Sequence, residues 1–156
     1  MCRWVCGRWS VVGGAVLAAV MTLVVLLRVA LSVVVVSGPS MSPALRPGQR
    51  VLVLRRGLAR LRAGRIVVVS PNGLAAPGGG PARRQPDRLL VKRLAALPGD
   101  PVPQSVRPVV AGGTVPGGHV VLLGDNPEFS TDSRTWGAVP ARSVVGVVLD
   151  GVRLRG

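Results

Sequence analysis

One lysine stands out in this chain as a residue whose type could do chemistry. The 156-residue sequence contains 20 lysines and arginines together, and all but Lys92 are arginines. In LLVKRLA, a strand places Leu90, Lys92 and Leu94 on one apolar face. Burial lowers the pKa of a lysine, and the neutral amine can accept a proton, which an arginine cannot do in a protein. Lys92 is therefore a candidate general base. The alternative is a lysine whose stem lies on the core and whose head reaches water.

A serine that such a base could activate follows the first apolar part of the chain. Ser40 stands in the Gly-Pro turn of SGPSMSP, residues 37–43, which can expose its hydroxyl and the neighbouring backbone N–H groups. A serine is a poor nucleophile without an adjacent base, and a neutral lysine can be that base. A third segment, GDNPEFSTDSRTWGAVP at 124–140, is rich in turn residues and adds the polar side chains of Ser130, Asp132 and Arg134.

The sequence has few of the residues that other kinds of catalytic site require. A Ser-His-Asp triad would have to use His119, the single histidine, which heads an apparent strand among core valines. That position favours a structural or surface role. No group of His, Cys, Asp and Glu has metal-ligand spacing, so we expect no metal and no cofactor. Cys2 and Cys6 are the two cysteines, so the body of the chain has neither a disulfide framework nor a cysteine nucleophile. These two cysteines are either sites of acylation or incidental residues at the edge of a membrane.

Short apolar runs between turns must position these residues. Runs of Val, Leu and Ile alternate with Gly and Pro, and nothing after residue 38 has a long helical period. The segment 71–86 has little apolar material and is expected to be a flexible loop, and another Gly/Pro-rich link lies near 98–118. We therefore predict a mainly β domain. Its expected strands are 33–36, 51–54, 66–69, 89–94, 119–123 and 144–149.

An apolar segment precedes this domain. Residues 11–27 carry no charge and are followed by Arg28, a length at the short end of the ~17 to 25 residues that span a bilayer. We expect one transmembrane helix at 11–29, after a cytoplasmic tail at 1–10 and before a catalytic domain at 30–156. A cleaved signal peptide that starts at Arg3 and Arg8 is the alternative, but the run is long for one and no clear small-x-small site follows.

The formal net charge of +14 has three possible origins. Clustered arginines bind nucleic-acid phosphates, and a basic surface can lie against anionic lipid headgroups. A genome rich in G and C would also favour Arg, Ala, Gly, Pro and Val together. The chain has no Tyr, one Phe, no zinc-finger spacing and no aromatic RNA-binding signature, so no nucleic-acid partner is expected.

Three motifs, in their order and after the apolar segment, make the chain resemble the type I signal peptidases. These serine peptidases remove signal peptides from exported proteins at the membrane. Each motif alone is weak, but the set is specific and covers about residues 11 to 150. The motifs are Ser-Met-x-Pro at 40–43, Lys-Arg with Leu-Pro-Gly-Asp at 92–100, and Gly-Asp-Asn with Ser-x-Asp-Ser-Arg and Trp-Gly at 124–137.

The resemblance implies a role for each matching residue. Ser40 is the nucleophile and its backbone N–H donates to the oxyanion, while Lys92 is the general base. Ser130 orients the lysine amine, and Asp132 and Arg134 form a supporting ion pair. Asp125 and Asn126 are expected to shape a turn. The residues expected near the substrate are Gly38, Met41 and Pro43.

The chain departs from the family in a few places. Ala44 replaces the usual Thr after the first motif, which removes a hydroxyl but no catalytic group. Where some members add a serine hydroxyl at the oxyanion site, this chain has Gly38, as other members do. Only about twenty residues separate Asp100 from His119, so the large insertion of some relatives is absent, and there is no second membrane segment.

The resemblance predicts a membrane-anchored serine endopeptidase that cleaves signal-peptide-bearing precursors. It implies single-pass insertion in the cell membrane, a cytoplasmic N-terminus, an outer catalytic domain and small substrate residues one and three before the cut. A dedicated maturation peptidase of the same family, with one or few precursors, is the nearest alternative. A self-cleaving repressor would carry a DNA-binding module in place of the apolar segment. A non-catalytic basic membrane protein is the alternative from another class.

Overall fold

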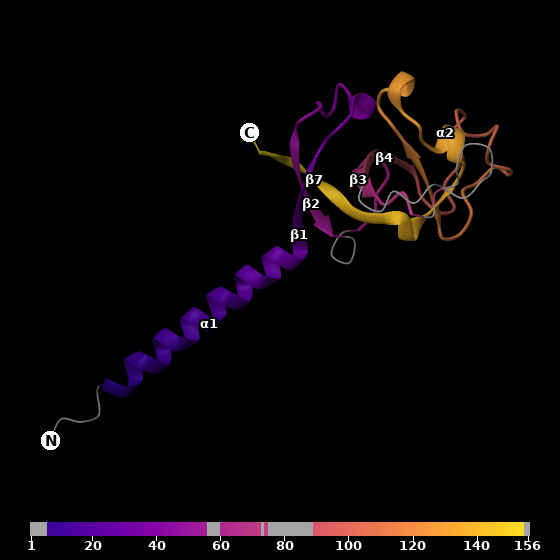
Figure 1. The fold of residues 1–156 in the computed structure, drawn as a ribbon. Helices are drawn as coiled ribbons and strands as arrows, with labels where there is room; N and C mark the ends of the chain where they lie inside the picture. The colour runs from indigo at the N-terminus through magenta and orange to yellow at the C-terminus, as the bar shows by residue number, and fades with distance from the viewer. Residues whose placement is uncertain (1–5, 56–59, 73, 75–88, 155–156) are drawn as a thin grey trace.

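A computed structural model describes residues 6–55, 60–72, 74 and 89–154, with the side chains of 6–13 and 150–154 left aside. It contains a long helix at the N-terminal side and a β domain formed by the rest of the chain (Figure 1). Most of the loop expected at 71–86 lies outside the described residues. The mainly β fold that the sequence predicts is confirmed.

Helix α1, Cys6–Ala30, points away from the β domain and passes directly into the first strand (Figure 1). The segment expected as an anchor, 11–29, lies within it. In the part of the chain that the structure describes, no helix is both long enough and apolar enough to cross a membrane, so that expectation is not confirmed.

Seven strands form one sheet in which every neighbouring pair is antiparallel. The order across the sheet is β1-β2-β7-β3-β4-β5-β6, so β1 is an edge strand. Each expected strand forms, and β6 is an additional two-residue strand. The strands are β1 Leu31–Val35, β2 Arg50–Arg55, β3 Ile66–Val69, β4 Leu90–Ala96, β5 His119–Leu123, β6 Val139–Pro140 and β7 Val144–Leu154.

Short helical turns complete the domain. They lie outside the sheet, and two of them contain motif residues: η1 includes Ser40 and α2 includes Arg134. These turns are η1 Pro39–Met41, η3 Pro127–Phe129, α2 Ser133–Trp136 and η4 Ala141–Ser143.

The central strand β3 explains why the apolar runs fold as strands. All four of its residues are buried, and side chains alternate between the faces of a strand. Val67 and Val69 join one core cluster, while Ile66 and Val68 join another. A continuous run of β-branched residues thus fills both sides of the sheet at once. Full burial of a side chain of this size stabilises the fold by about 1.5 kcal/mol or more.

The segment expected as a link at 98–118 has a packed interior. Pro101 pairs with Thr114 in an isolated bridge, and a third core cluster forms against β4 and β5. The first three of its four valines are four residues apart, but prolines at 101, 103 and 108 interrupt that helical spacing, which is why the sequence does not reveal the cluster. The four valines are Val102, Val106, Val110 and Val115.

The pairing of β4 with β5 prepares the site. Arg93 lies opposite Leu123, the last residue of β5. Lys92, one residue earlier, therefore lies beside the loop that begins at Gly124. Residues more than thirty positions apart meet because two strands pair.

Candidate active site

The amine of Lys92 is buried and points to the loop after β5. The residue is 3 % exposed, and its Nζ donates a hydrogen bond to Ser130 Oγ at 2.7 Å. Leu90 and Leu94 pack with one core cluster and Val91 with the other, as the alternation along β4 predicts. The alternative of a lysine head that reaches water does not describe this side chain.

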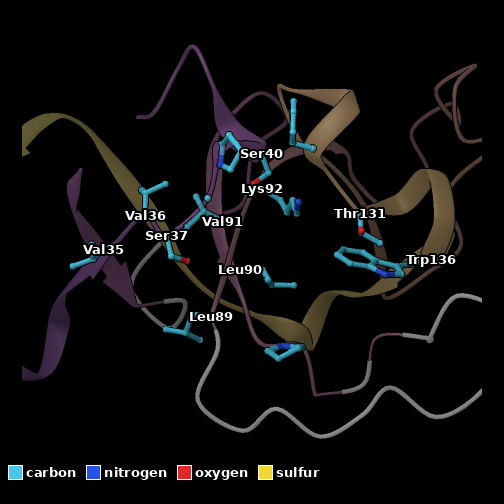
Figure 2. A pocket seen from close by; sticks show the side chains of 14 residues that line it. Val35, Val36, Ser37, Ser40, Leu89, Leu90, Val91, Lys92, Thr131 and Trp136 are labelled. Atoms are coloured by element: carbon cyan, nitrogen blue, oxygen red, sulfur yellow. The ribbon is translucent and has the colours of Figure 1, made fainter. Parts of the chain in front are cut away.

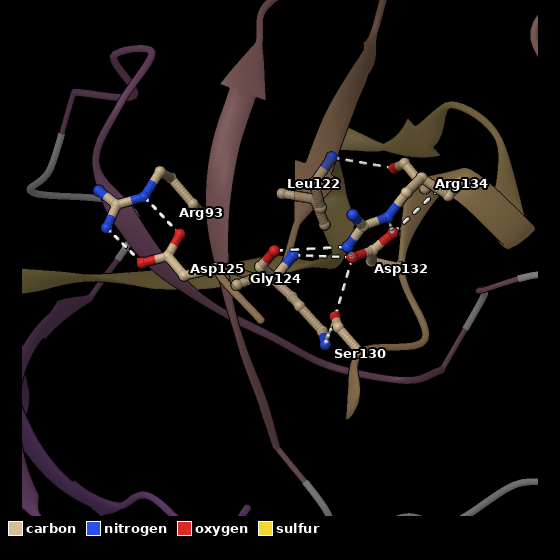
Figure 3. Close-up of polar contacts among 9 residues, drawn as sticks. Arg93, Leu122, Gly124, Asp125, Ser130, Asp132 and Arg134 are labelled. Atoms are coloured by element: carbon tan, nitrogen blue, oxygen red, sulfur yellow. Dashed lines mark hydrogen bonds and ion pairs between the residues drawn. The ribbon is translucent and has the colours of Figure 1, made fainter. Parts of the chain in front are cut away.

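Ser130 passes the network on to a carboxylate. Its hydroxyl donates to Asp132 Oδ2 at 2.8 Å. A serine hydroxyl has one proton, so a hydroxyl that donates to Asp132 can only accept from Lys92. One N–H of the lysine is thereby directed at Ser130, and the nitrogen lone pair faces elsewhere. Figure 3 shows Ser130, Asp132 and Arg134 in one connected group.

Asp132 is fully buried and surrounded by donors. It accepts hydrogen bonds from the Gly124 amide at 2.8 Å and from Arg134 Nε at 2.9 Å, and it forms an ion pair with that guanidinium. Burial by itself raises the pKa of Asp132, but the hydrogen bonds from Arg134, Gly124 and Ser130 outweigh burial and hold the pKa below its usual value. The carboxylate is therefore ionised at neutral pH.

The pKa of Lys92 lies below the usual value of a lysine. Desolvation by burial is the largest cause, since it disfavours the ammonium form. The negative charge of Asp132 acts in the opposite direction, and the positive charge of Arg134 again lowers the pKa. Arg134 thus offsets the carboxylate that would otherwise hold a proton on the amine.

Gly124 lets three parts of the site approach one another. A Cβ at this position would lie 2.0 Å from Ser130 Oγ and 2.8 Å from the carbonyl oxygen of Ser40. Both distances are far below van der Waals contact, so no other residue fits without moving a site residue. The sequence shows this glycine only as part of a turn, and the close approach is visible only in three dimensions.

Ser40 lies in the turn η1, at the wall of a pocket that Lys92 also lines. The backbone N–H of Asn126 donates to the Ser40 carbonyl at 3.0 Å, so the loop after β5 holds the turn in place. Among the described residues the Ser40 hydroxyl has no hydrogen-bond partner. Figure 2 shows Ser40 and Lys92 close together, with Val36 on one side of them and Thr131 and Trp136 on the other.

The pocket has a volume of about 370 Å³ and draws on distant parts of the chain. One side comes from the end of β1 and the turn after it, and the other from the start of β4 and from α2. Its wall combines apolar side chains with the polar side chains of Ser37, Ser40, Lys92 and Thr131. The lining residues also include Val35, Val36, Leu90, Phe129 and Trp136.

A second charge pair lies on the other face of β4 and was missed in the sequence. Arg93 donates to Asp125 through Nε at 2.7 Å and also forms an ion pair with it. Arg93 donates as well to the Gly64 carbonyl at 2.7 Å. Asp125 thus ties its loop to β4, where only a turn was expected. The contact could have been predicted from the pairing of Arg93 with Leu123, but that pairing is known only once the order of the strands in the sheet is known.

The remaining predicted residues separate into two groups. Gly38 lines the pocket, whereas Met41 is fully buried in a core cluster and Pro43 is exposed, and neither of these two is among the lining residues. His119 bonds the Gly117 carbonyl at the start of β5 and is not among the lining residues either. No group of three or more metal-binding side chains occurs in the described ranges.

This arrangement can perform proton transfer to and from a lysine amine next to a serine hydroxyl. A buried amine with a lowered pKa can act as a base, and a serine hydroxyl is the kind of nucleophile that such a base can activate. The described residues thus hold the groups for acyl transfer in one pocket.

Comparison with known proteins agrees with this chemistry. The family model described as signal peptidase, peptidase S26, matches residues 8–106 and 103–149. The chain is 35 % identical over 130 residues to the mitochondrial ATP-independent inner membrane protease subunit 1a of Arabidopsis thaliana, which covers 78 % of this chain and 70 % of that protein.

Two further relatives carry similar names. The mitochondrial inner membrane protease subunit 1 of Xenopus tropicalis is 36 % identical over 119 residues, covering 73 % of this chain and 64 % of the relative. That of Schizosaccharomyces pombe is 36 % identical over 110 residues, covering 67 % and 62 %. The chain therefore spans roughly two thirds of the length of these relatives.

Proposed function

Because the chain belongs to the S26 family of signal peptidases, a family of serine peptidases, we propose that it is a serine endopeptidase with Ser40 as nucleophile and Lys92 as general base. The observation that carries the proposal is the buried amine of Lys92, bonded to Ser130 and placed in one pocket with Ser40. The supporting roles go to Ser130, which orients the amine, and to the Asp132–Arg134 pair.

The first step is attack by Ser40. Neutral Lys92 takes the hydroxyl proton as Ser40 Oγ forms a bond to the carbonyl carbon of the scissile peptide. Ser130 holds one N–H of the amine, so the lone pair can face Ser40. The backbone N–H of Ser40 donates to the oxyanion that forms.

The second step releases the leaving group. The ammonium of Lys92 gives its proton to the leaving nitrogen, the carbon–nitrogen bond breaks, and the acyl group stays on Ser40. Water then attacks the acyl-enzyme, with Lys92 again as base, and the carboxylic acid leaves. The lowered pKa of Lys92 serves both steps, since the amine must be neutral before the first and must give up its proton in the second.

The substrate is inferred to be a limited set of precursor proteins. The relatives are named inner membrane proteases, and none of these names describes general removal of signal peptides. This favours the dedicated maturation peptidase over the general signal peptidase that we expected first. Cleavage of a panel of purified precursors would distinguish the two kinds of enzyme. A dedicated peptidase cleaves one or few of the precursors and leaves the rest intact, whereas a general signal peptidase cleaves most of them.

Membrane attachment through α1 completes the proposal. From residue 16 to residue 29 the large apolar side chains of α1 are exposed, and five successive ones, residues 23–27, point all round the helix. Exposed apolar surface on every side is typical of a helix in contact with lipid. The N-terminus and domain orientation expected from Arg3 and Arg8 stay predictions.

Attachment can be tested by alkaline extraction of membranes from cells that express the full chain. The wild type should stay in the membrane fraction, and the variant Leu23→Glu with Leu26→Glu should be released. Release of the wild type would contradict attachment.

The decisive test of the enzyme is cleavage of a signal-peptide-bearing precursor in detergent. Ser40→Ala and Lys92→Arg should abolish cleavage, because one lacks the nucleophile and the other keeps the charge but cannot deprotonate. The control His119→Ala should cleave. Activity of Lys92→Arg would overturn the mechanism, and loss only in a folded His119→Ala would revive a histidine triad. Salt-dependent lipid binding without cleavage would favour the non-catalytic basic protein.

A further inference from the structure

Aromatic residues are rare in this chain, and the β domain places its two at the pocket. The sequence has one Phe, three Trp and no Tyr. Two tryptophans belong to the first nine residues, which leaves Phe129 and Trp136 for everything that follows. Both line the pocket. A core built almost entirely of Val and Leu therefore has aromatic side chains only where a substrate would pass.

Trp136 is held firmly in its place. It ends α2, is half-buried, and packs with Leu90 against the core cluster that contains Leu94 and Leu122. The centre of its ring lies 5.9 Å from Lys92 Nζ. In Figure 2, Trp136 and Thr131 lie on the opposite side of Lys92 from Val35.

The distance from the lysine amine indicates which substrate residue meets this ring. The amine that protonates the leaving nitrogen must come within about 3 Å of it. The side chain of the residue that carries this nitrogen begins two bonds further, about 2.5 Å away. A side chain attached there can reach the indole, which lies on the side of Lys92 opposite Val35, whereas the residue before the cut is attached to the carbonyl at Ser40.

We propose that Trp136 and Leu90 wall a subsite for an apolar side chain on the residue immediately after the scissile bond. This inference rests on the proposed function of the same pocket. The face of an indole and a leucine side chain offer dispersion contacts and exclude water, so they favour an aliphatic or aromatic side chain over a small or polar one. Trp136 is then a specificity residue.

The test uses peptides that differ only at the residue after the cut. The wild type should show a kcat/KM for Leu about tenfold above that for Ala, a typical gain for extra methylene groups in an apolar pocket. Trp136→Ala should reduce this ratio to about twofold or less, and Trp136→Phe should give an intermediate value. A ratio within one enzyme preparation does not depend on how much of the variant is folded.

Val35→Ala is the matched control, because Val35 lines the pocket on the other side. It should leave the Leu to Ala ratio unchanged. The inference is overturned if the wild type shows no preference at this position, if Trp136→Ala slows both peptides by one factor, or if it changes the preference before the cut instead. These results all require a cleaving wild type, so they are distinct from failure of the proposed function.

Discussion

Two arginine–aspartate pairs lie on opposite faces of strand β4, and they differ in how deeply they are buried. The pair of Arg134 with Asp132 lies on the face of Lys92, with the aspartate side chain 0 % exposed. The pair of Arg93 with Asp125 lies on the opposite face, with side chains 36 % and 18 % exposed. Both aspartates belong to the segment that follows β5.

The difference in burial separates chemistry from scaffolding. Charges in a buried pair act on a nearby amine with little screening by water, so the inner pair influences the pKa of Lys92. A pair that is partly exposed is screened and contributes about 1 kcal/mol or less to stability. The outer pair therefore holds a loop in place, while the inner pair also tunes the proposed base. Four predictions test this division.

The largest effect on activity is expected at Gly124. Its backbone N–H donates to Asp132 of the inner pair, and Asp125 of the outer pair is the next residue in the chain. Gly124→Ala forces its Cβ against Ser130 and the Ser40 carbonyl, which displaces both the proposed nucleophile and the residue that orients the amine of Lys92. We expect kcat/KM on a cleavable precursor to fall by more than about a hundredfold, since a displacement of about 1 Å costs that much. Gly113→Ala is the control, because a Cβ there meets nothing within 4 Å. Equal activity of the two variants would contradict the close approach.

Asp132→Asn should produce the largest loss of stability. It leaves the Arg134 guanidinium without its buried partner, so the free energy of unfolding at pH 7 should fall by about 3 kcal/mol in urea titrations. The pKa of Asp132 is lowered in the fold, so its contribution is present above the unfolded pKa and is lost as pH falls through the folded pKa. The gap between wild type and variant should therefore close in acid. A gap that is constant with pH would argue against an ionised Asp132.

Arg134→Gln should change the pH dependence of the reaction more than its maximum. Without the guanidinium, the Asp132 charge raises the pKa of Lys92, and more of the amine is protonated at neutral pH. We expect kcat/KM at pH 7 to fall several-fold, with the acid limb of the profile moved to higher pH and activity recovered in alkali. A uniform loss at every pH would assign Arg134 a structural role alone.

The smallest effect is expected in the outer pair. Asp125→Asn weakens the contact with Arg93, which should lower the free energy of unfolding by about 1 kcal/mol or less. The acid limb of the pH profile should stay where it is in the wild type. A movement of that limb as large as in Arg134→Gln would show that the two pairs do not differ as described.

The strands of the sheet can be predicted from the sequence because each one is a short apolar run that is visible locally. Runs such as IVVV at 66–69 are bounded by turn residues, and the structure keeps them as strands. The two-residue strand β6 contains Pro140 and is too short to leave a pattern. The order of the strands in the sheet also does not follow from the apolar runs, because β7, the last strand in the chain, lies between β2 and β3.

The site divides in the same way. Ser40, Lys92 and Ser130 can be named from motifs, because their residue types carry the chemistry. The close approach at Gly124 and the Arg93–Asp125 pair depend on the register of β4 with β5, which the sequence does not state. The burial of Met41 in a core cluster likewise does not follow from its place in a motif.

The direct passage from α1 into β1 has a geometric consequence. An extended strand advances about 3.3 Å per residue, so the five residues of β1 form a stiff spacer of roughly 17 Å between the helix end and the turn that carries Ser40. This spacer is locked at every position by its pairing with β2. The β1–β2 pairing therefore fixes the distance between the end of α1 and the start of the segment that leads to Ser40, the proposed nucleophile.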